Sequence, residues 1–439
     1  MSSLVSESLR NTGFAEVFAL LHDETPQRPE SVITDFVAED RAIGQWTPDS
    51  RRPAPSFEVL ESRAETLTRV SSYFASGLEN QTMLLAAEDF AEPPPAMTFF
   101  PRLGVCYGAV TKERLVALRR DPAVAFVGGT PQFSLIAFRF GRDTKPELGP
   151  TWGIGSMRIP MLWDQGLDGT GVLVGHLDTG VDARHPTLRA AIHSYLETDR
   201  IGGAIVGAQP HDTEQHGTHT AGTIAGRPID GYSIGVAPGA MLASATIVEG
   251  GKIALRLLAG LEWVLTQDAR IVNISVGVVG LVNDFIPILT KVRRQGVLPV
   301  VAVGNDGPGA SRSPGNYPQA LSVGAIDRSD SVWPSSSSQR FRRSEDPVVP
   351  DLVAPGVDII SAKAGGGYRF DEGSSMATPH ISGLAALLFQ ARPTASIDQV
   401  EQAICDSCVR PASMLLDRGN RGIPDAVEAL AQLTRSVVG

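Results

Sequence analysis

The chain has little of what a disulfide-bonded or membrane-embedded protein requires. It contains three cysteines in 439 residues, and so small and odd a number argues against a disulfide framework. Its uninterrupted apolar stretches are far shorter than the ~20 residues that a transmembrane helix needs, so we expect a soluble protein without a membrane partner. The first ten residues have neither a basic leader nor an apolar core of signal-peptide length, which predicts a cytoplasmic location.

Basic charge is also in short supply. The sequence has 38 Lys and Arg against 48 Asp and Glu, a formal net charge of −10, and this balance disfavours nucleic acid as a partner. Cys405 and Cys408 form a Cys-x-x-Cys pair. No second pair or nearby histidine completes a metal site around them, so we interpret the pair as incidental.

One block near the C-terminus, residues 373–380, surrounds a serine with features of a nucleophile. Ser375 opens a stretch, Met376–Ala391, whose recurring Ala and Leu predict a helix. Pro379 suits a first helical turn, because the amide hydrogen that proline lacks is not needed there. Ser375 is therefore predicted at a helix N-terminus, where unpaired N–H groups and the helix dipole can stabilise an oxyanion.

Three blocks upstream supply the other groups that a serine nucleophile needs. Residues 171–177 are an almost continuous apolar run, typical of a buried parallel strand, and Asp178 follows at its end. His216 leads a predicted helix of small residues, and a β-branched strand ends in Asn305. A carboxylate, a general base and a nucleophile are the parts of an acyl-transfer site, and a carboxamide can donate to the oxyanion.

In this order, the four blocks resemble the subtilisin-like serine proteases, or subtilases, over roughly residues 152–433. The resemblance implies that Asp178 orients the base, His216 is the general base, Ser375 is the nucleophile and Asn305 is the oxyanion donor.

The resemblance also implies which segments bind the substrate. The residues expected to contact the peptide are Val248, Glu249, Gly250, Ser275, Val276, Gly277, Ala302, Val303 and Gly304. Arg312 is expected near the floor of the pocket for the residue before the scissile bond, where a guanidinium would pair with an acidic side chain. The alternative is that Arg312 points into solvent from an exposed loop.

Some of these residues also fit other classes of site. Residues 178–180, Asp-Thr-Gly, also suit an aspartic protease, but that class needs a second such triplet or a homodimer and leaves the other blocks unexplained. His219 is interpreted as a packed helix residue, the alternative being a zinc site with His216 and Asp178. Thr187 offers no carboxylate where subtilases often bind calcium. We therefore expect no cofactor or metal at these positions, and calcium elsewhere stays open.

The residues before the catalytic region show a second α+β pattern. A strand at 97–109, a helix at 111–120 and a strand at 123–127 resemble the latter half of the inhibitory propeptide of subtilases, the alternative being an unrelated accessory domain. The predicted organisation is an N-terminal segment of unknown role (1–29), a propeptide-like α+β domain (30–137), a linker (138–151) and the catalytic domain (152–439). A self-cleavage site is expected between Gln132 and Gly149.

Alternating strands and helices predict an α/β fold, a mainly parallel sheet with helices on both faces, behind a smaller α+β prodomain. Strands are expected at 171–177, 205–208, 242–247, 271–275, 297–303 and 321–325. The predicted function is a serine endopeptidase that acts on a protein or peptide inside the cell. We expect a zymogen whose own N-terminal domain is an intramolecular inhibitor. A catalytically silent binding protein, or a peptide ligase that uses the same acyl-enzyme, remains open.

Overall fold

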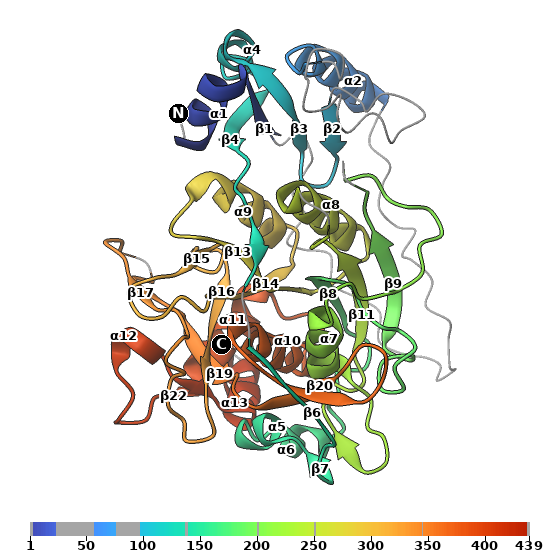
Figure 1. The fold of residues 1–439 in the computed structure, drawn as a ribbon, viewed down its shortest axis with the longest axis vertical. Helices are drawn as coiled ribbons and strands as arrows, with labels where there is room; N and C mark the ends of the chain where they lie inside the picture. Colours follow the sequence, from blue (N-terminus) through green and yellow to red (C-terminus); the bar gives the residue numbers. More distant parts are fainter. Residues whose placement is uncertain are drawn as a thin grey trace. The chain divides into compact units, whose positions relative to one another are not determined.

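The computed structural model describes residues 3–22, 57–75, 97–136, 139–199, 202–249, 252–344 and 346–436. They form two compact units (Figure 1). The first unit contains the described residues up to Phe99 together with Gly104–Val127, and the second contains Phe100–Leu103 and everything described from Gly128 onward. Within these ranges, no helix combines the length and the apolar character of a transmembrane segment.

The first unit is built on a four-stranded sheet with the order β2-β3-β1-β4. Its elements are α1 (Ser3–Thr12), β1 (Phe14–Leu21), α2 (Phe57–Ser71), β2 (Met97–Phe100), β3 (Val105–Thr111), α4 (Lys112–Leu118) and β4 (Val124–Gly129). β1 runs antiparallel to β3, and its Val17 is buried in one cluster with Leu115 of α4. Residues 14–21, assigned from the sequence to a separate segment, thus form an inner strand of this sheet.

The helix predicted at 111–120 is α4, and it begins as expected. The side chain of Thr111 accepts a hydrogen bond from the N–H of Arg114 at 3.3 Å, which satisfies one of the open amides of the first turn. The strand predicted at 97–109 is instead two strands, β2 and β3, because a turn at residues 101–104 interrupts it.

The second unit contains a seven-stranded parallel sheet with the order β19-β16-β14-β12-β8-β11-β9. The strands are β8 (Leu173–Asp178), β9 (Ile192–Glu197), β11 (Met241–Thr246), β12 (Ile271–Ile274), β14 (Leu298–Ala302), β16 (Leu321–Ile326) and β19 (Leu352–Pro355). The predicted α/β fold with a mainly parallel sheet is confirmed.

The strand predicted at 205–208 is wrong. These residues form a turn at 206–207 and no strand, and Val206 is 97% exposed. The edge strand is β9, whose alternately polar sequence gives a weaker signal because one side of an edge strand is not covered by a neighbour. An apolar run was therefore mistaken for a buried strand, and a polar edge strand was missed.

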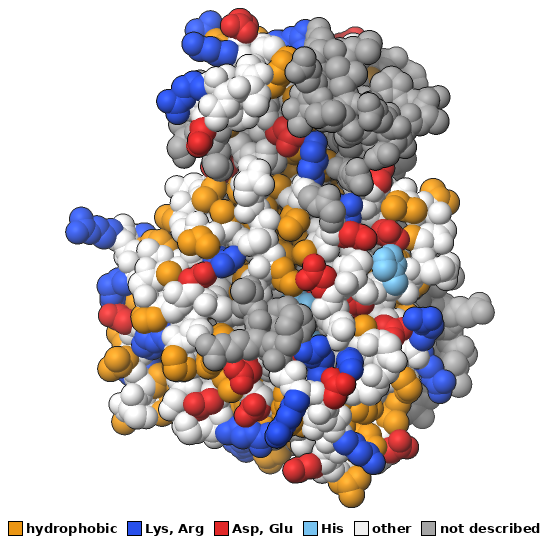
Figure 2. Space-filling model, viewed as in Figure 1, with side chains coloured by type: hydrophobic (Ala, Val, Ile, Leu, Met, Phe, Trp, Pro, Cys, Tyr) orange, Lys and Arg blue, Asp and Glu red, His pale blue; other side chains and the backbone are white. Residues whose placement is uncertain are grey.

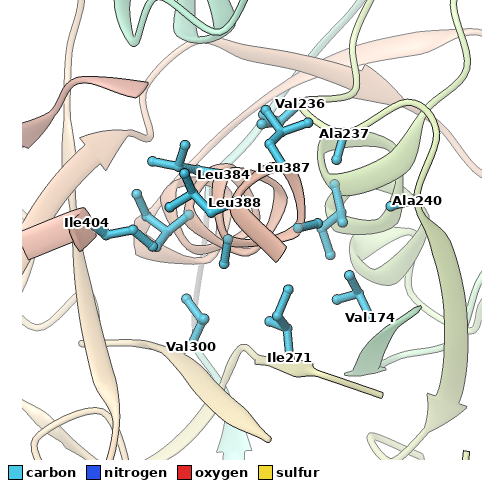
Figure 3. Packing of buried hydrophobic residues seen from close by; sticks show 14 of the residues in the cluster. Val174, Val236, Ala237, Ala240, Ile271, Val300, Leu384, Leu387, Leu388 and Ile404 are labelled. Carbon is cyan, nitrogen blue, oxygen red and sulfur yellow. The ribbon is translucent and has the colours of Figure 1, made fainter. Parts of the chain in front are cut away.

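Helices lie on both faces of the sheet. They are α7 (His216–Ala225), α8 (Ile253–Thr266), α9 (Ile286–Arg294), α10 (Ser374–Ala391), α11 (Ile397–Asp406) and α13 (Ala426–Ser436), with short helices α5 (Trp152–Ser156), α6 (Pro160–Trp163), η1 (Asn283–Phe285) and α12 (Leu416–Gly419). Figure 3 shows Leu384 and Leu388 of α10 above Ile271 and Val300 of the sheet. Each fully buried leucine contributes roughly 1.5–3 kcal/mol, so α10 is held firmly over the centre of the sheet.

Short strands complete the second unit. A three-stranded sheet joins β15 (Arg312–Ser313), β13 (Val276–Val279) and β5 (Ser134–Leu135), and another joins β20 (Ile359–Ala362), β21 (Tyr368–Glu372) and β6 (Arg139–Thr144). Paired short strands are β7 (Gly149–Pro150) with β10 (Tyr232–Ser233), β17 (Gln339–Arg340) with β18 (Val348–Val349), and β22 (Cys408–Val409) with β23 (Ile423–Pro424). The segment 138–151, predicted as a linker, therefore contributes two strands, β6 and β7.

Charged side chains of both signs are interspersed over the described part of one molecular face (Figure 2). The net charge of −10 is therefore not gathered into one acidic patch on that face.

Candidate active site

The predicted acid and base come from neighbouring elements. β8 ends at Asp178 and α7 begins at His216, and Nδ1 of His216 lies 2.6 Å from Oδ1 of Asp178. The backbone N–H of Thr179 donates to the same carboxylate oxygen at 2.7 Å, and Asp178 and His216 are fully buried. A hydrogen bond to a carboxylate places the proton on Nδ1 and makes Nε2 the basic nitrogen of the ring.

The two groups set each other's charge. Burial alone would raise the pKa of Asp178, but His216 and the hydrogen bonds to the carboxylate hold that pKa below the ordinary aspartate value. Burial alone would lower the pKa of His216, but the charge of Asp178 raises that pKa above the ordinary histidine value. The pair is therefore suited to accept a proton at Nε2 and to stabilise the imidazolium that results.

Two glycines allow α7 to approach the end of β8. A Cβ at Gly217 would lie 2.0 Å from the carbonyl oxygen of Gly180, and a Cβ at Gly180 would lie 2.0 Å from that of His211. Gly180 also has φ +110°, a conformation that side chains disfavour. Any larger residue at either position would push His216 away from Asp178.

The predicted nucleophile stands at the start of α10. Ser375 is the second residue of that helix, is fully buried, and lies on an element that packs against α7. Within the described residues its hydroxyl has no hydrogen-bond partner, so the Ser375–His216 hydrogen bond is not formed in the intact chain. Such bonds are often long until substrate is bound.

The predicted place of Pro379 in the first turn of this helix is wrong. α10 begins at Ser374, so Pro379 lies in the second turn, inside the helix. Its missing N–H deprives the carbonyl of Ser375 of its usual helical donor. The neighbouring residues nevertheless keep helical geometry, because α10 is buried along most of its length.

Asn305 is tied to the same helix terminus. Its Oδ1 accepts a hydrogen bond from the backbone N–H of Ser374 at 2.9 Å. The backbone N–H of Gly304 in turn donates to the hydroxyl of Ser374 at 3.3 Å. With Oδ1 committed as an acceptor, Nδ2 is the atom of Asn305 that can donate to an oxyanion, which is the role predicted from the sequence.

Strand β13, which contains residues predicted to bind the substrate backbone, is paired with another segment of the same chain. β5 pairs antiparallel with β13, with Leu135 opposite Val276 and Ser134 opposite Gly277. The N–H of Ile136 then donates to the carbonyl of Ser275 at 3.1 Å. The segment Ser134–Ile136 therefore pairs along strand β13 as an extended peptide ligand would.

Packing strengthens this pairing. The ring of Phe133 meets that of Phe285 edge to face, with centroids 4.9 Å apart, an arrangement that aromatic pairs favour. Phe133 and Ile136 are buried, whereas Ser134 between them is exposed. The extended segment thus buries the side chains of Phe133 and Ile136 in the second unit and leaves Ser134 exposed.

The chain next pairs with the strand that leads into the helix of the predicted nucleophile. β6 pairs antiparallel with β21, with Arg139 opposite Glu372, and Glu372 lies directly before the glycine that precedes α10. The N–H of Gly141 also donates to the buried carboxylate of Asp371 at 3.2 Å. Residues 134–136 thus pair with β13, which contains predicted substrate-binding residues, and residues 139–144 pair with β21, which leads into the Ser375 helix.

The expectation for Arg312 needs correction. Its Nε and one terminal nitrogen donate to the two carboxylate oxygens of Asp306 at 2.7 and 2.8 Å, and its other terminal nitrogen donates to the hydroxyl of Ser134 at 3.1 Å. The guanidinium therefore does not offer an unneutralised charge at the pocket floor, nor does it point into solvent, since its side chain is only 12% exposed. It contacts the segment on β13 two residues before Ile136.

The other predicted substrate-binding residues lie as follows. Ala302, Val303 and Gly304 are buried at the end of β14, and Val248 is buried with its N–H directed to the carbonyl of Asp178 at 3.3 Å. Glu249 is partly exposed, and Gly250 lies outside the described residues.

The remaining histidines and cysteines have structural surroundings. His219 is buried on α7, with Nε2 2.9 Å from the carbonyl oxygen of Ile359. Thr187 pairs with Nδ1 of His185 at 2.8 Å. Burial raises the pKa of the Cys408 thiol to about 12, so it carries a proton at neutral pH.

Side chains spaced closely enough to bind a metal ion occur at a different place from the alternative zinc site considered from the sequence. Among the described residues, it is found for Glu197, His211 and Glu249. His216, His219 and Asp178, which the alternative zinc site would require, do not form such a group in that part of the chain.

Sequence reasoning missed two polar residues beside the catalytic pair. His176 lies in β8 two residues before Asp178, and Thr220 lies on α7 one turn after His216; both are fully buried. The hydroxyl of Thr220 is 3.1 Å from Oδ2 of Asp178. A histidine within an apolar strand was the available signal, because buried polar groups need hydrogen-bond partners.

Comparison with known proteins agrees with this geometry. The model of the Subtilase family matches residues 169–427. Subtilisin E of Bacillus subtilis (strain 168) is 30% identical over 314 residues, which cover 70% of this chain and 75% of that protein. An alkaline protease of Alkalihalobacillus alcalophilus is 30% identical over 335 residues, 75% of this chain and 81% of that protein. Bacillopeptidase F of Bacillus subtilis (strain 168) is 33% identical over 326 residues, 65% of this chain and 22% of that protein. Because the family model matches more than half of its residues, the chain belongs to the subtilase family and is a serine endopeptidase.

Proposed function

We propose that this endopeptidase uses Asp178, His216, Ser375 and Asn305, and that it is made as a zymogen. Ser375 Oγ attacks the scissile carbonyl carbon as its proton passes to Nε2 of His216. Asp178 holds the imidazolium through Nδ1–H, and Nδ2 of Asn305 donates to the oxyanion. His216 then gives its proton to the leaving amine, and water hydrolyses the acyl-enzyme with His216 again as base.

The observation that carries the zymogen proposal is the path of the chain past Ser375. Ser134–Ile136 lies along β13, whose residues are predicted to bind substrate, and 139–144 lies along β21, which leads through Gly373 into α10. An extended segment that adds as a strand to a substrate-binding strand is held as a peptide ligand would be. We therefore propose self-cleavage on the carboxyl side of Ile136, within the window of Gln132 to Gly149 expected from the sequence.

The N-terminal domain is proposed to remain as an inhibitor after this cut. Hydrolysis removes one covalent bond but leaves the β5–β13 pairing and the Phe133–Phe285 contact in place. A second contact within the second unit supports this: Glu262 of α8 accepts the backbone N–H groups of Arg102 and Leu103, which also precede the proposed cut, at 2.8 and 2.9 Å. Activation then requires that the N-terminal fragment dissociates or is degraded.

The chain's own segment also supports a proposal for specificity. A buried Ile136 precedes the proposed scissile bond, and Arg312 is neutralised by Asp306. We expect the pocket to prefer aliphatic residues and not acidic ones. A peptide library cleaved by the activated enzyme tests this, and an enrichment of Asp or Glu before the cut would contradict it.

The zymogen proposal is tested with full-length protein and its Ser375→Ala variant. Intact-mass analysis should find a fragment ending at Ile136 in the wild type and an uncut S375A chain. A fluorophosphonate should label the wild type and not S375A. An active wild type that stays uncut would show that the N-terminal domain has another role, and a labelled S375A would overturn the assigned nucleophile.

A peptide ligase is supported by one specific observation. β6 is paired with β21, so the newly formed amine would be tethered beside the acyl-enzyme and could attack it in place of water. Added amine nucleophiles should then trap acyl-transfer products in competition with hydrolysis. The cytoplasmic location stays a prediction that cell fractionation can test.

A further inference from the structure

A chain of buried polar groups leads from the sheet to the carboxylate of Asp178. His176 of β8 lies directly opposite Ser244 of β11, and its Nδ1 is 2.9 Å from the Ser244 hydroxyl. Its Nε2 is 2.8 Å from the hydroxyl of Thr220 on α7. All of these side chains are fully buried, so each polar group would be costly without its partner.

The hydroxyl of Thr220 has a choice of acceptors for its single proton. It lies 3.1 Å from Oδ2 of Asp178, 3.3 Å from the carbonyl oxygen of His216 and 3.1 Å from that of Gly217. A carboxylate is a stronger acceptor than a neutral carbonyl. The proton is therefore assigned to the bond with Asp178.

This assignment determines the tautomer of His176. Once Thr220 donates to Asp178, its oxygen can only accept from the ring, so Nε2 of His176 must carry the proton. Nδ1 is then an acceptor, and the hydroxyl of Ser244 donates to it. Ser244 thus donates to His176, His176 donates to Thr220, and Thr220 donates to Asp178. Each contact then has one donor and one acceptor.

We propose that His176 is a positioning residue for this protease, which acts through Thr220 to hold the second carboxylate oxygen of Asp178. The proposal rests on the roles assigned above to Asp178 and His216. Two donors from the protein, Thr179 on Oδ1 and Thr220 on Oδ2, then hold the carboxylate in the plane that the imidazole of His216 requires.

The surroundings keep His176 neutral, as this role requires. Burial lowers the pKa of His176, against the attraction of Asp178 and Asp212, and the nearby His216 lowers it further. From β12, the neighbour opposite His176 is the uncharged Asn273. A neutral ring donates to Thr220 without adding a positive charge that would oppose protonation of His216.

Loss of the His176 donor should redirect the Thr220 hydroxyl to the carbonyl oxygens of α7, as threonines in helices commonly do. Oδ2 of Asp178 would then be buried without a donor, and its charge would be balanced by His216 alone. The pKa of His216 should rise, moving the acidic limb of the kcat/KM profile upward by roughly 0.5–1 pH unit. We expect kcat to fall about 10-fold, as for the loss of a hydrogen bond to a charged group.

Two replacements of His176 distinguish a donor at Nε2 from mere packing. Glutamine reaches the position of Nε2 with an N–H, whereas the shorter asparagine reaches only the side of Ser244. H176Q should stay within about 3-fold of the wild type, while H176N should show the loss and the shifted limb. Thr220→Val should reproduce the H176N effect, and the double variant should add little to either single one.

The matched control is another buried histidine. His185 is hydrogen-bonded through both nitrogens, to Thr187 and to the carbonyl of Gly367, each at 2.8 Å, and neither hydrogen bond involves Asp178. H185Q should lower Tm without moving the acidic limb. If H176N moves Tm alone, as H185Q does, the proposal is overturned.

NMR supplies a readout that does not depend on turnover. In full-length S375A protein, long-range 1H–15N correlations should show the Nε2–H tautomer of His176. The same spectra should give the titration of His216 in S375A and in the S375A/H176N double variant. An Nδ1–H tautomer, or a His216 pKa unchanged by H176N, would overturn the proposal. Since the tautomer and the titration are read without turnover, these results stand whether or not Ser375 proves to be the catalytic serine.

Discussion

Replacing Ile136 with alanine should slow self-cleavage of the full-length chain by roughly 30-fold or more. Ile136 is fully buried next to strand β13, and removing a buried isoleucine side chain down to alanine costs about 2–5 kcal/mol. That cost falls on the conformation that can be cleaved, because an undocked Ile136 is exposed to water. At about 1.4 kcal/mol for each factor of ten, the lower bound corresponds to ~30-fold.

Aspartate at the same position should be more harmful than alanine. A carboxylate of similar length would be buried without a partner, since Arg312 is already paired with Asp306, and an unpaired buried charge is among the most costly substitutions. We expect I136D to show no cut at this position on the time scale of the wild-type reaction.

Time-resolved intact-mass analysis of refolding protein measures these rates. Gln132→Ala is the matched control, because Gln132 is exposed and lies outside the β5–β13 pairing; its rate should equal that of the wild type. Processing of I136A at the wild-type rate would refute the reasoning, as would faster cleavage of I136D.

Four further predictions concern catalysis. Alanine at Ser375 or His216 should each lower kcat by on the order of 10⁶, and the double variant should lose little more, because the two act as a unit. Asn305→Ala should lower kcat by about 10²–10³ with KM nearly unchanged, since Nδ2 acts on the oxyanion and not on the bound substrate; a rise in KM alone would contradict this. Arg312→Ala should change selectivity at the third residue before the cut, and not at the residue next to it, when both enzymes are compared on a peptide library. Because Asp178 raises the pKa of His216, kcat/KM should fall as pH decreases through a value above the ordinary ~6.5 of histidine, and Asp178→Asn should lower that midpoint in a pH–rate profile.

Local sequence was sufficient for the parts of the site that lie at element boundaries. Asp178 ends an apolar strand, and Ser375 lies in the first turn of a helix rich in Ala and Leu; both patterns reflect burial of the element on which the residue stands. Asp178 ends a parallel strand, where sheets of this kind place their sites, and the Ser375 helix packs against the helix that His216 begins. The same reasoning failed for residues 205–208, where an apolar run is exposed.

Contacts between segments that are distant in the sequence could not be predicted from local patterns. The path of Ser134–Ile136 along β13 depends on backbone hydrogen bonds, which carry almost no side-chain signature. Pro379 was placed one turn too early, because a long buried helix tolerates a missing hydrogen bond that an isolated helix would not. Arg312 was expected to act on substrate, and its partner Asp306 was not considered.

By itself, the sequence determined the α/β class, the family and the order of the acid, base and nucleophile, because buried strands, helix starts and small-residue turns leave strong local patterns. Only the tertiary structure decided how these groups are supported and what covers them. The hydrogen bonds from His176 through Thr220 to Asp178 join two separate elements, and the strands β5 and β6 reach β13 and β21 across long stretches of sequence. Such interactions depend on which surfaces come together in the folded chain, and this is set by the packing of the whole sheet and not by any one segment.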